Sequence, residues 1–347
     1  LKDFKEADDK YNSGLFDFSK DKLSPALSIN NNTIKTIIDQ LYYPECPYEF
    51  SVLDVEILGS AYEQFLGKTI TINNRGKAVI EVKPAVRKAG GVYYTPQYIV
   101  DYIVENTLGK AIKNKTPKDV AKIKIVDPAC GSGSFLIGAY HYLLVWHTNY
   151  YKKNPKKKNP ITPQGNLNTT EKRRILLNNI YGVDIDANAV EVTKLSLLLK
   201  CMEGETQSSI SHQLKLFHER VLPTLDQNIK CGNSLVDMDY YDSQFDFGEE
   251  RVINPFSWQQ AFPNIFENGG FDFVIGNPPY VFTRDVDWSD EVKNYYWSKF
   301  EISKANDKSR KNQSGKINLY ILFILKSTEL LNKKGVLSFI IPNGLLR

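Results

Sequence analysis

The sequence predicts an α/β fold, in which a doubly wound parallel sheet occupies residues 89–347 and a small, mainly helical domain occupies residues 1–88. Two observations predict the sheet. Short apolar segments rich in β-branched residues recur between stretches of helical periodicity. The first of these segments is followed by a glycine-containing turn and a helix, and this order forms the nucleotide-cradling unit of doubly wound sheets.

The composition is that of an ordinary globular protein and excludes few functions. Of the 347 residues, 42% are hydrophobic and 24% are charged, and a net charge of +4 does not by itself indicate a nucleic-acid ligand. Four cysteines without a C-x-x-C pair, and no signal peptide, predict reduced thiols in a cytoplasmic protein. No apolar run is long enough to span a membrane, so no membrane partner is expected. The spacing of the four histidines predicts no metal site.

The first 88 residues contain two helical patterns and one hairpin pattern. Apolar positions recur at helical spacing over residues 33–43 and 52–65. Residues 69–72 and 78–82 have the composition of strands, and the Asn-Asn-Arg-Gly segment between them is typical of a hairpin turn. We therefore expect a small helical domain with one hairpin, in which no residue pattern indicates chemistry.

Residues 90–110 begin with two glycines and two tyrosines and continue as an amphipathic helix. Thr95 is a residue type favoured at helix N-caps, and Pro96 suits the first helical position. The glycines and tyrosines ahead of the helix indicate either a simple helix start or a close approach of the backbone to a ligand. Both interpretations remain open from the residues alone.

The first strand of the sheet is expected over residues 122–127, which alternate and then become fully apolar. It ends at Asp127, and a turn of small residues leads from it into an apolar helix that extends to about Trp146. Gly131 and Gly133 have no Cβ, so the backbone of this turn can approach a ligand closely. The third glycine of the dinucleotide-binding fingerprint is missing from the expected position.

A basic segment separates this helix from the second strand. Residues 149–174 are rich in lysine, proline and asparagine and are expected to form a loop, which either contacts DNA phosphates or is a solvated insertion. The strand over residues 179–184 ends at Asp184, and an acid at this place binds ribose hydroxyls in doubly wound folds. A long helix is expected from Asp186 to about Met202.

A third strand ends at Asn233, and residues 237–268 are expected to form an irregular excursion before the fourth strand, over residues 271–275. Residues 281–316 are expected to form a long polar loop. Its interleaved aromatic and basic residues, among them Tyr295 and Tyr296, suit either nucleic acid or solvent.

The chain is expected to end with a helix over residues 317–331 and a fifth strand over residues 335–341. The five strands then have the order 3-2-1-4-5, which leaves the fifth as an exposed apolar edge. An exposed edge invites pairing with another chain, so we expect residues beyond Arg347 to cover it.

The residues Asn277, Pro278, Pro279 and Tyr280 follow the fourth strand and carry the clearest chemistry. Two prolines cannot continue a strand ladder, so this tetrad lies at the carboxyl edge of the sheet, where ligands bind. The side-chain oxygen of Asn277 and the carbonyl of Pro278 can each accept one hydrogen from the exocyclic amine of a purine. Together they stabilise the positive charge that develops when this nitrogen is methylated, and Tyr280 offers a ring on which the base stacks. The alternative is a Pro-Pro turn capped by asparagine.

Taken in order, the motifs resemble those of the gamma-class N6-adenine DNA methyltransferases. They are Tyr-Tyr-Thr-Pro, Asp-Pro-Ala-Cys-Gly-Ser-Gly, Gly-Val-Asp-Ile-Asp, Cys-Gly-Asn-Ser-Leu and Asn-Pro-Pro-Tyr, and they fall within residues 90–347. The closer likeness is to the methyltransferase region of type IIG (Eco57I-like) restriction-modification enzymes and related type I modification subunits. Residues 58–66 look like the helical domain that precedes this region. The resemblance implies a Rossmann-like methyltransferase sheet, incomplete at its C-terminal end.

The resemblance also implies S-adenosylmethionine as methyl donor and an adenine flipped out of double-stranded DNA as acceptor, with the tetrad as catalytic residues. Asn233 stands where many relatives carry an aspartate beside the adenine of the cofactor. The implied cofactor-binding residues come from the first motif, the glycine turn and the ends of the second and third strands: Tyr94, Thr95, Asp127, Ala129, Gly131, Gly133, Asp184 and Asn233.

The same tetrad also serves protein-glutamine methyltransferases and some RNA methyltransferases, and a non-catalytic DNA-binding subunit is a further alternative. The intact tetrad and the Tyr-Tyr-Thr-Pro motif favour DNA adenine methylation. Relatives of this kind carry a target-recognition domain after the sheet, and type IIG enzymes carry a nuclease ahead of the helical domain. Residues 1–88 show no nuclease signature. We therefore expect sequence recognition and cleavage to reside in other parts of the full-length protein or in a partner subunit.

Overall fold

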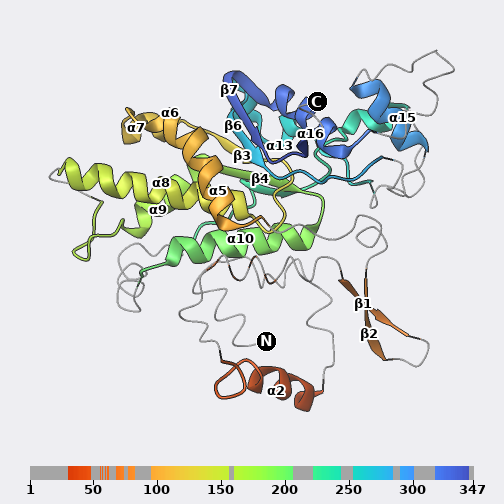
Figure 1. Cartoon of the computed structure of the whole chain (residues 1–347), viewed down its shortest axis with the longest axis horizontal. Helices are drawn as coiled ribbons and strands as arrows, with labels where there is room; N and C mark the ends of the chain where they lie inside the picture. The colour runs from red at the N-terminus through yellow and green to blue at the C-terminus, as the bar shows by residue number, and fades with distance from the viewer. Residues whose placement is uncertain are drawn as a thin grey trace.

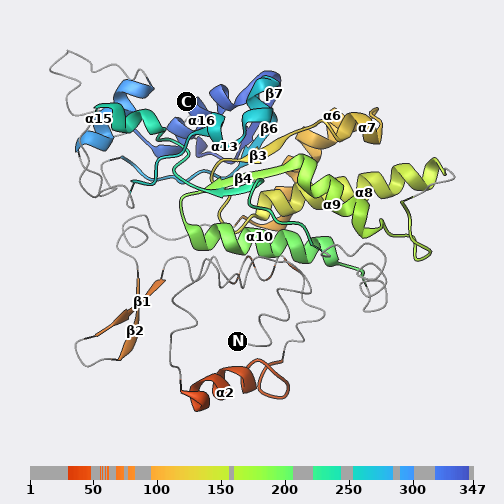
Figure 2. The ribbon, with the colours of Figure 1, turned by 180° about the vertical axis from the view of Figure 1, so that it is seen from behind.

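The computed structural model describes most of the sheet domain and parts of the N-terminal region, and Figures 1 and 2 show it from opposite sides. The expected domain boundary at residue 88 and the side chain of Tyr94 lie outside the described residues. The described residues are 30–47, 55, 57, 59, 61, 68–73, 77–82, 95–155, 160–205, 222–243, 253–283, 290–300 and 317–343.

A sheet of five parallel strands forms the centre of the described residues. Every pair of neighbours is parallel, so the carboxyl ends of the strands meet at one edge. The strand order is β5-β4-β3-β6-β7, which confirms the expected α/β fold and the order 3-2-1-4-5. The strands are β3 (Ile125–Asp127), β4 (Ile180–Asp184), β5 (Ile229–Cys231), β6 (Phe271–Gly276) and β7 (Leu331–Phe339).

Strand β7 lies at one edge of the sheet, as expected, but it is longer at its start than the sequence indicated. Leu331 already pairs with Phe271, and a register shift separates this pair from the regular ladder that begins at Val336. The side chain of Val336 is 41% exposed at this edge. The cover expected from residues beyond Arg347 remains a prediction.

Helices cover both faces of the sheet. Alternate strand residues point to opposite sides, so Ile125 and Phe273 belong to one buried cluster and Val126 and Val274 to another. In Figure 1, α5, α8, α9 and α10 lie on one side of the strands, and α13 and α16 lie on the other. The helices around the sheet are α5 (Gln97–Val104), a π-helical turn η2 (Glu105–Gly109), α6 (Lys110–Ile112), α7 (Pro117–Val120), α8 (Ser134–Lys153), α9 (Thr169–Asn179), α10 (Ala187–Met202), α13 (Trp258–Ala261), α14 (Pro263–Glu267) and α16 (Leu319–Leu330).

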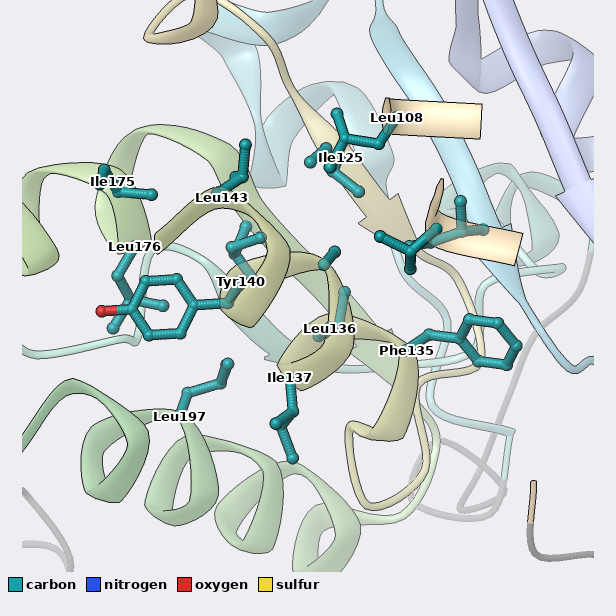
Figure 3. Close-up of a cluster of buried hydrophobic side chains, with 14 of the residues drawn as sticks. Leu108, Ile125, Phe135, Leu136, Ile137, Tyr140, Leu143, Ile175, Leu176 and Leu197 are labelled. Atoms are coloured by element: carbon teal, nitrogen blue, oxygen red, sulfur yellow. The ribbon is translucent and has the colours of Figure 1, made fainter. Parts of the chain in front are cut away.

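Helix α8 carries the main core of the sheet domain. Its buried side chains lie between strand residue Ile125 and the helices α9 and α10 (Figure 3). The phenol of Tyr140 donates to the carbonyl oxygen of Lys172 at 3.0 Å, which joins α8 to α9. Each large apolar side chain buried in this way contributes about 1.5–3 kcal/mol. The glycine turn at the start of α8 is therefore attached to a well-packed part of the protein.

The prediction of a loop over residues 149–174 is wrong at both ends of this range, because each end is helical. Helix α8 continues past Trp146, because His147 and Tyr151 extend its packed stripe. Helix α9 begins after Asn168, whose side-chain oxygen accepts from the backbone N–H of Glu171 at 2.9 Å. The basic residues in the middle of this helix hide its apolar periodicity in the sequence.

Two other segments expected to be irregular also contain helices. Within residues 237–268 the chain forms a 3₁₀ helix, η3 (Met238–Ser243), and the helices α13 and α14. Helix α15 (Asp290–Lys299) lies in the expected polar loop. Tyr296 is buried, and the ring of Tyr295 stands edge-on to Tyr240 of η3, with the ring centroids 5.4 Å apart. The interpretation that these two tyrosines face nucleic acid is therefore wrong, because they pack α15 onto η3.

The N-terminal elements that are described agree with the expected types. Helix α2 (Asn31–Asp39) lies within two residues of the expected start, and the side chain of Asn30 caps it by accepting from Asn32 at 2.8 Å. Strands β1 (Lys68–Ile72) and β2 (Ala78–Val82) form the expected antiparallel hairpin. Among the helices that the structure describes, none has the length and apolar character needed to cross a membrane.

Candidate active site

The turn between β3 and α8 is packed on one side and open on another. Gly131 and Gly133 have φ angles of +54° and +88°, a region that favours glycine. A Cβ on Gly133 would approach Thr193 of α10 to 2.8 Å, whereas a Cβ on Gly131 would meet no described atom within 4 Å. The hydroxyl of Thr193 also donates to the carbonyl of Gly131 at 2.8 Å. Thr193 thus fixes the turn, and the space beside Gly131 can receive a ligand.

Asp184 lies at the end of β4 and binds the glycine turn. Its Oδ2 accepts from the backbone N–H of Gly131 at 2.8 Å, and its Oδ1 accepts from the backbone N–H of Asp186 at 2.9 Å. Burial raises the pKa of Asp184, while these two N–H donors and the N–H of Ile185 oppose the shift. A carboxylate has about four lone-pair sites, so the group can still accept a hydrogen from a hydroxyl of a ligand.

Asp127 connects the glycine turn to the strand that carries the tetrad. Its Oδ1 accepts from the backbone N–H of Ala129 at 3.0 Å. A Cβ on Gly276 would lie 2.6 Å from the same Oδ1. Gly276 directly precedes Asn277, so Asp127, one of the implied cofactor residues, and the tetrad share one edge of the sheet. The sequence predicted Asp127 and the tetrad separately, but it gave no sign that they are in contact through Gly276.

The carboxyl group of Asp127 is almost fully buried, and burial increases its affinity for a proton. The pKa of Asp127 is raised to about 8, mainly by burial and to a smaller extent by the negative charge of Asp184, while the N–H of Ala129 opposes the shift. The folded protein therefore holds this proton at a pH where the unfolded chain, with an ordinary value near 3.8, has lost it. The stabilisation from this group is complete below about pH 4 and is lost as the pH rises towards about 8.

We therefore expect the thermal unfolding midpoint of the protein, measured without cofactor, to fall as the pH is raised from about 5 to about 8. In the Asp127→Asn variant the amide oxygen still accepts from Ala129, but no proton is lost, so the decline should be shallower. Differential scanning calorimetry of both proteins across this range tests the assignment. Parallel pH profiles in the two proteins would contradict it.

Asn277 and Thr95 lie 182 residues apart in sequence and are hydrogen-bonded in the structure. The Nδ2 of Asn277 donates to the hydroxyl oxygen of Thr95 at 3.1 Å. The expectation that Thr95 caps a helix is wrong: α5 begins at Gln97, its cap residue is Pro96, and no side chain caps it. Thr95 is instead buried against the tetrad.

Tyr280 is held by contacts at its hydroxyl and at its ring. The hydroxyl donates to Oδ1 of Asn277 and to the backbone carbonyl of Ile340, the latter at 2.7 Å. The ring stands edge-on to Tyr320 of α16, with the ring centroids 6.1 Å apart. Burial raises the pKa of Tyr280 to about 12, so the phenol keeps its proton at neutral pH. Ile340 takes part through its backbone carbonyl, which any residue type would supply, so no residue pattern predicts its role.

The other implied cofactor residues are placed less completely. Asn233 lies at the end of β5, where its Oδ1 accepts from Leu235 N–H at 3.1 Å and its Nδ2 donates to the carbonyl of Ile253 at 3.2 Å. Its oxygen keeps one lone pair, so a contact with the adenine of a cofactor remains a prediction. Tyr94 lies outside the described residues, and its role also remains a prediction.

The residues present fit a ligand that carries a ribose. Among the described residues, no atom lies within 4 Å of a Cβ placed on Gly131, and the carboxylate of Asp184 next to it can accept from a ribose hydroxyl. Helix residue Gly59 of the N-terminal region also lies near the turn, since a Cβ there would lie 3.5 Å from the hydroxyl of Ser132. These observations support a cofactor site formed by the glycine turn and the end of β4.

The described residues of the basic segment expected to contact DNA or solvent divide into two parts, and Lys156, Lys157 and Lys158 lie outside the described residues. Lys172 is buried and binds Glu205 at 3.3 Å, and Arg174 binds Glu171 at 2.7 Å, so these two charges are paired within the domain. Lys152 and Lys153 are exposed at the end of α8. A helix of this length places them roughly 30 Å from the glycine turn, which favours the solvated interpretation.

Two family profiles match the chain. The profile of the Eco57I restriction-modification methylase family matches residues 178–347, a range that includes Asp184 and the tetrad. The profile of the RMKL-like methyltransferase domain matches residues 104–220, a range that includes the glycine turn. Together the two matches cover the sheet and every strand that contributes to the candidate site.

The chain is also similar to individual proteins. The type II restriction enzyme and methyltransferase RM.Eco57I of Escherichia coli is 36% identical, over 100% of this chain and 32% of that protein. The adenine-specific methyltransferase PglX of Streptomyces coelicolor is 24% identical, over 59% of this chain and 16% of that protein. The chain thus spans a third or less of these two relatives. Among solved structures, the type ISP restriction-modification enzyme LlaBIII bound to DNA has a TM-score of 0.45 at 14% identity, over 94% of this chain and 20% of that one.

Proposed function

Because this chain belongs, through its methylase domain, to the Eco57I-like restriction-modification methylases, we propose that it transfers a methyl group from S-adenosylmethionine to the N6 nitrogen of adenine in DNA. The observation that carries the proposal is the arrangement of acceptor oxygens at the tetrad. The side-chain oxygen of Asn277 and the backbone carbonyl of Pro278 stand next to each other in the chain, just beyond the end of β6. Among the described residues, none donates to the carbonyl of Pro278.

Two acceptors on one exocyclic amine have a specific chemical effect. The lone pair of this amine is delocalised into the purine ring, so the nitrogen is a poor nucleophile. Hydrogen bonds from its two hydrogens to Asn277 and Pro278 pull the nitrogen towards tetrahedral geometry and stabilise the positive charge that develops on it. An amide oxygen is too weak a base to remove a proton before attack, so both groups act by orientation and charge stabilisation. Once methylated, the nitrogen would be cationic and strongly acidic and would lose its extra proton to water, and the donor would be left as a neutral thioether.

S-adenosylmethionine, when bound, supplies the electrophilic methyl group. Asp184 would hold its ribose hydroxyls, and the turn from Ala129 to Gly133 would surround it. Since Asp127 packs against Gly276, the residues that hold the cofactor are fixed relative to those that hold the amine. This fixed relation supports methyl transfer, because the rate depends on how closely the two reacting groups are positioned.

The acceptor base must leave the DNA duplex to reach the tetrad. The ring of Tyr280 is the stacking surface we propose for the flipped adenine. Its hydroxyl and its edge-on contact with Tyr320 fix the ring, so little conformational freedom is lost when the base stacks. Stacking on an aromatic side chain contributes about 1–3 kcal/mol per base.

The sequence that is methylated is not determined by these residues. We propose that target recognition and DNA cleavage reside in other parts of the full-length protein or in partner subunits, since this chain spans 32% of RM.Eco57I. The four cysteines are free thiols, which supports a reducing compartment. We therefore propose that the protein acts in the cytoplasm.

Transfer of tritium from labelled S-adenosylmethionine to duplex DNA tests the proposal. We expect label in DNA when the full-length protein is supplied with both substrates. Label in protein or in RNA, with none in DNA, would favour the other methyltransferases that share the tetrad. Failure to bind the cofactor in calorimetry would favour a non-catalytic DNA-binding subunit.

A further inference from the structure

The carboxamide of Asn277 lies between two hydroxyl groups. Its Nδ2 donates to Thr95, which comes from the segment before α5, and its Oδ1 accepts from Tyr280 within the tetrad. Both ends of the amide are therefore held, one by each hydroxyl. Thr95 is only 6% exposed, so water does not readily take its place.

The orientation of this amide matters for the proposed reaction. If the oxygen and nitrogen of Asn277 exchanged places, the amide would present an N–H donor towards the amine of the target base. Two donors facing each other repel, and the acceptor that stabilises the developing charge would be lost. A free carboxamide rotates between these two states, so some contact in the protein must select the productive one.

The chemistry of the two hydroxyls selects the orientation seen. A phenol gives up its hydrogen more readily than an aliphatic alcohol, and the oxygen of an alcohol is the better acceptor. The amide oxygen therefore pairs best with Tyr280, and the amide nitrogen pairs best with Thr95. The reverse orientation would use the weaker donor and the weaker acceptor at the same time.

Both hydroxyls are fixed by the surrounding fold. The hydroxyl of Tyr280 also donates to the carbonyl of Ile340, whose own N–H donates to the carbonyl of Gly276 at 3.1 Å. The phenol has one hydrogen for two acceptors, so Ile340 can take it fully when a target amine approaches Oδ1 of Asn277. Thr95 is held because α5 packs tightly on α8, where Val100 occupies the space that a Cβ on Gly138 would need.

We propose that Thr95 is a positioning residue for catalysis, whose hydroxyl holds the side chain of Asn277 with its oxygen directed to the target amine. This role rests on the proposed function and is additional to the cofactor contact implied by the resemblance. The two roles make different demands. A cofactor contact affects binding of S-adenosylmethionine, whereas a positioning contact affects the rate once the cofactor and the base are bound.

The test compares Thr95→Val, which keeps the shape of the side chain and removes the hydroxyl, with Thr95→Ser, which keeps the hydroxyl. In single-turnover methylation of duplex DNA at saturating cofactor, we expect Thr95→Val to be about tenfold slower and Thr95→Ser to be close to the parent.

Tyr280→Phe alone should have a mild effect, because Thr95 still holds the amide. The double variant Thr95→Val/Tyr280→Phe should lose about a hundredfold and approach Asn277→Ala. In the Asn277→Ala background, Thr95→Val should change the rate little.

Thr107→Val is the matched control. Thr107 follows α5 in the same continuous helical segment and donates to the carbonyl of Ile103 at 2.6 Å, without contact to the tetrad. The methylation rate of the Thr107→Val variant should equal that of the parent. If Thr95→Val weakens cofactor binding in calorimetry while the rate at saturation stays at the parental value, Thr95 is a cofactor contact only and the proposal is overturned.

A readout independent of activity separates this proposal from the proposed function. The side-chain amide resonance of Asn277 can be assigned in isotope-labelled protein, because it is lost in Asn277→Ala. We expect this resonance to shift in Thr95→Val and to stay near its parental position in Thr95→Ser. An unshifted resonance in Thr95→Val overturns the positioning role. A parental protein that transfers no methyl group to DNA refutes the proposed function, and the resonance still decides whether Thr95 holds the amide.

Discussion

Replacing Asn277 with alanine should lower the single-turnover rate of DNA methylation by about a hundred- to a thousandfold. The variant loses the side-chain oxygen that accepts from the target amine, and this contact acts mainly in the transition state. The affinity for S-adenosylmethionine should change little, because the described hydrogen bonds of Asn277 join it to Thr95 and Tyr280 and not to Asp184 or the glycine turn. Rate and affinity together distinguish lost chemistry from lost binding.

A matched control for Asn277→Ala is Asn168→Ala. Asn168 caps α9, on the face of the sheet that α8 covers, and it is not among the site residues. Loss of this helix cap should lower the free energy of unfolding by about 1 kcal/mol and leave the methylation rate unchanged. If Asn277→Ala methylates DNA at the parental rate, the tetrad is a structural turn and the mechanism proposed here is wrong.

Replacing Asp184 with alanine should weaken S-adenosylmethionine binding about ten- to a hundredfold. The variant removes the acceptors for two ribose hydroxyls, and hydrogen bonds to a charged group are worth about 1.5–3 kcal/mol. The structure adds a second cause, because the N–H of Gly131 loses the partner that holds the glycine turn in place. Isothermal titration calorimetry with the cofactor measures the change.

The neighbouring acid Asp186 provides the control for Asp184. Its side chain accepts from Asn188 at 2.9 Å and caps α10, so it serves the helix rather than the cradle. Asp186→Ala should cost about 1 kcal/mol of stability and change the affinity for the cofactor only slightly. Equal affinities in the parent and in Asp184→Ala would contradict the assignment of Asp184 to the ribose.

The strand ends and the tetrad were predictable because their signals are local. Asp127 and Asp184 each end a short apolar segment, and Asn277 follows one directly, so their shared edge follows from a parallel sheet. The strand order also follows from the usual arrangement of such sheets. In each case a few adjacent residues carry the whole signal, and the structure places these residues as expected.

The contacts that hold the site together were not predictable, because they join segments far apart in the chain. The bond between Thr95 and Asn277 spans 182 residues, and the bond between Thr193 and Gly131 spans 62. The local pattern even suggested a different role for Thr95, since a threonine before a proline and an amphipathic helix is typical of an N-cap. Tertiary packing overrides the local preference here.

Charge and aromatic content gave misleading signals for a related reason. Lys172 and Tyr296 belong to segments that were expected to face solvent or nucleic acid, but both side chains are buried in the structure. A lysine can be buried when a carboxylate pairs with it, and Glu205, 33 residues away, does so here. Composition alone cannot show such a partner, so segments rich in polar residues were expected to be loops where the structure has helices.

Single-molecule sequencing of DNA from cells that express the full-length gene, beside cells that express its Asn277→Ala form, tests the central claim most directly. We expect N6-methyladenine at the copies of one short sequence in the first DNA and its absence from the second, with both proteins present at equal amounts. Equal adenine methylation in both, or unmodified adenine in both, would contradict the proposal that this tetrad methylates DNA adenine.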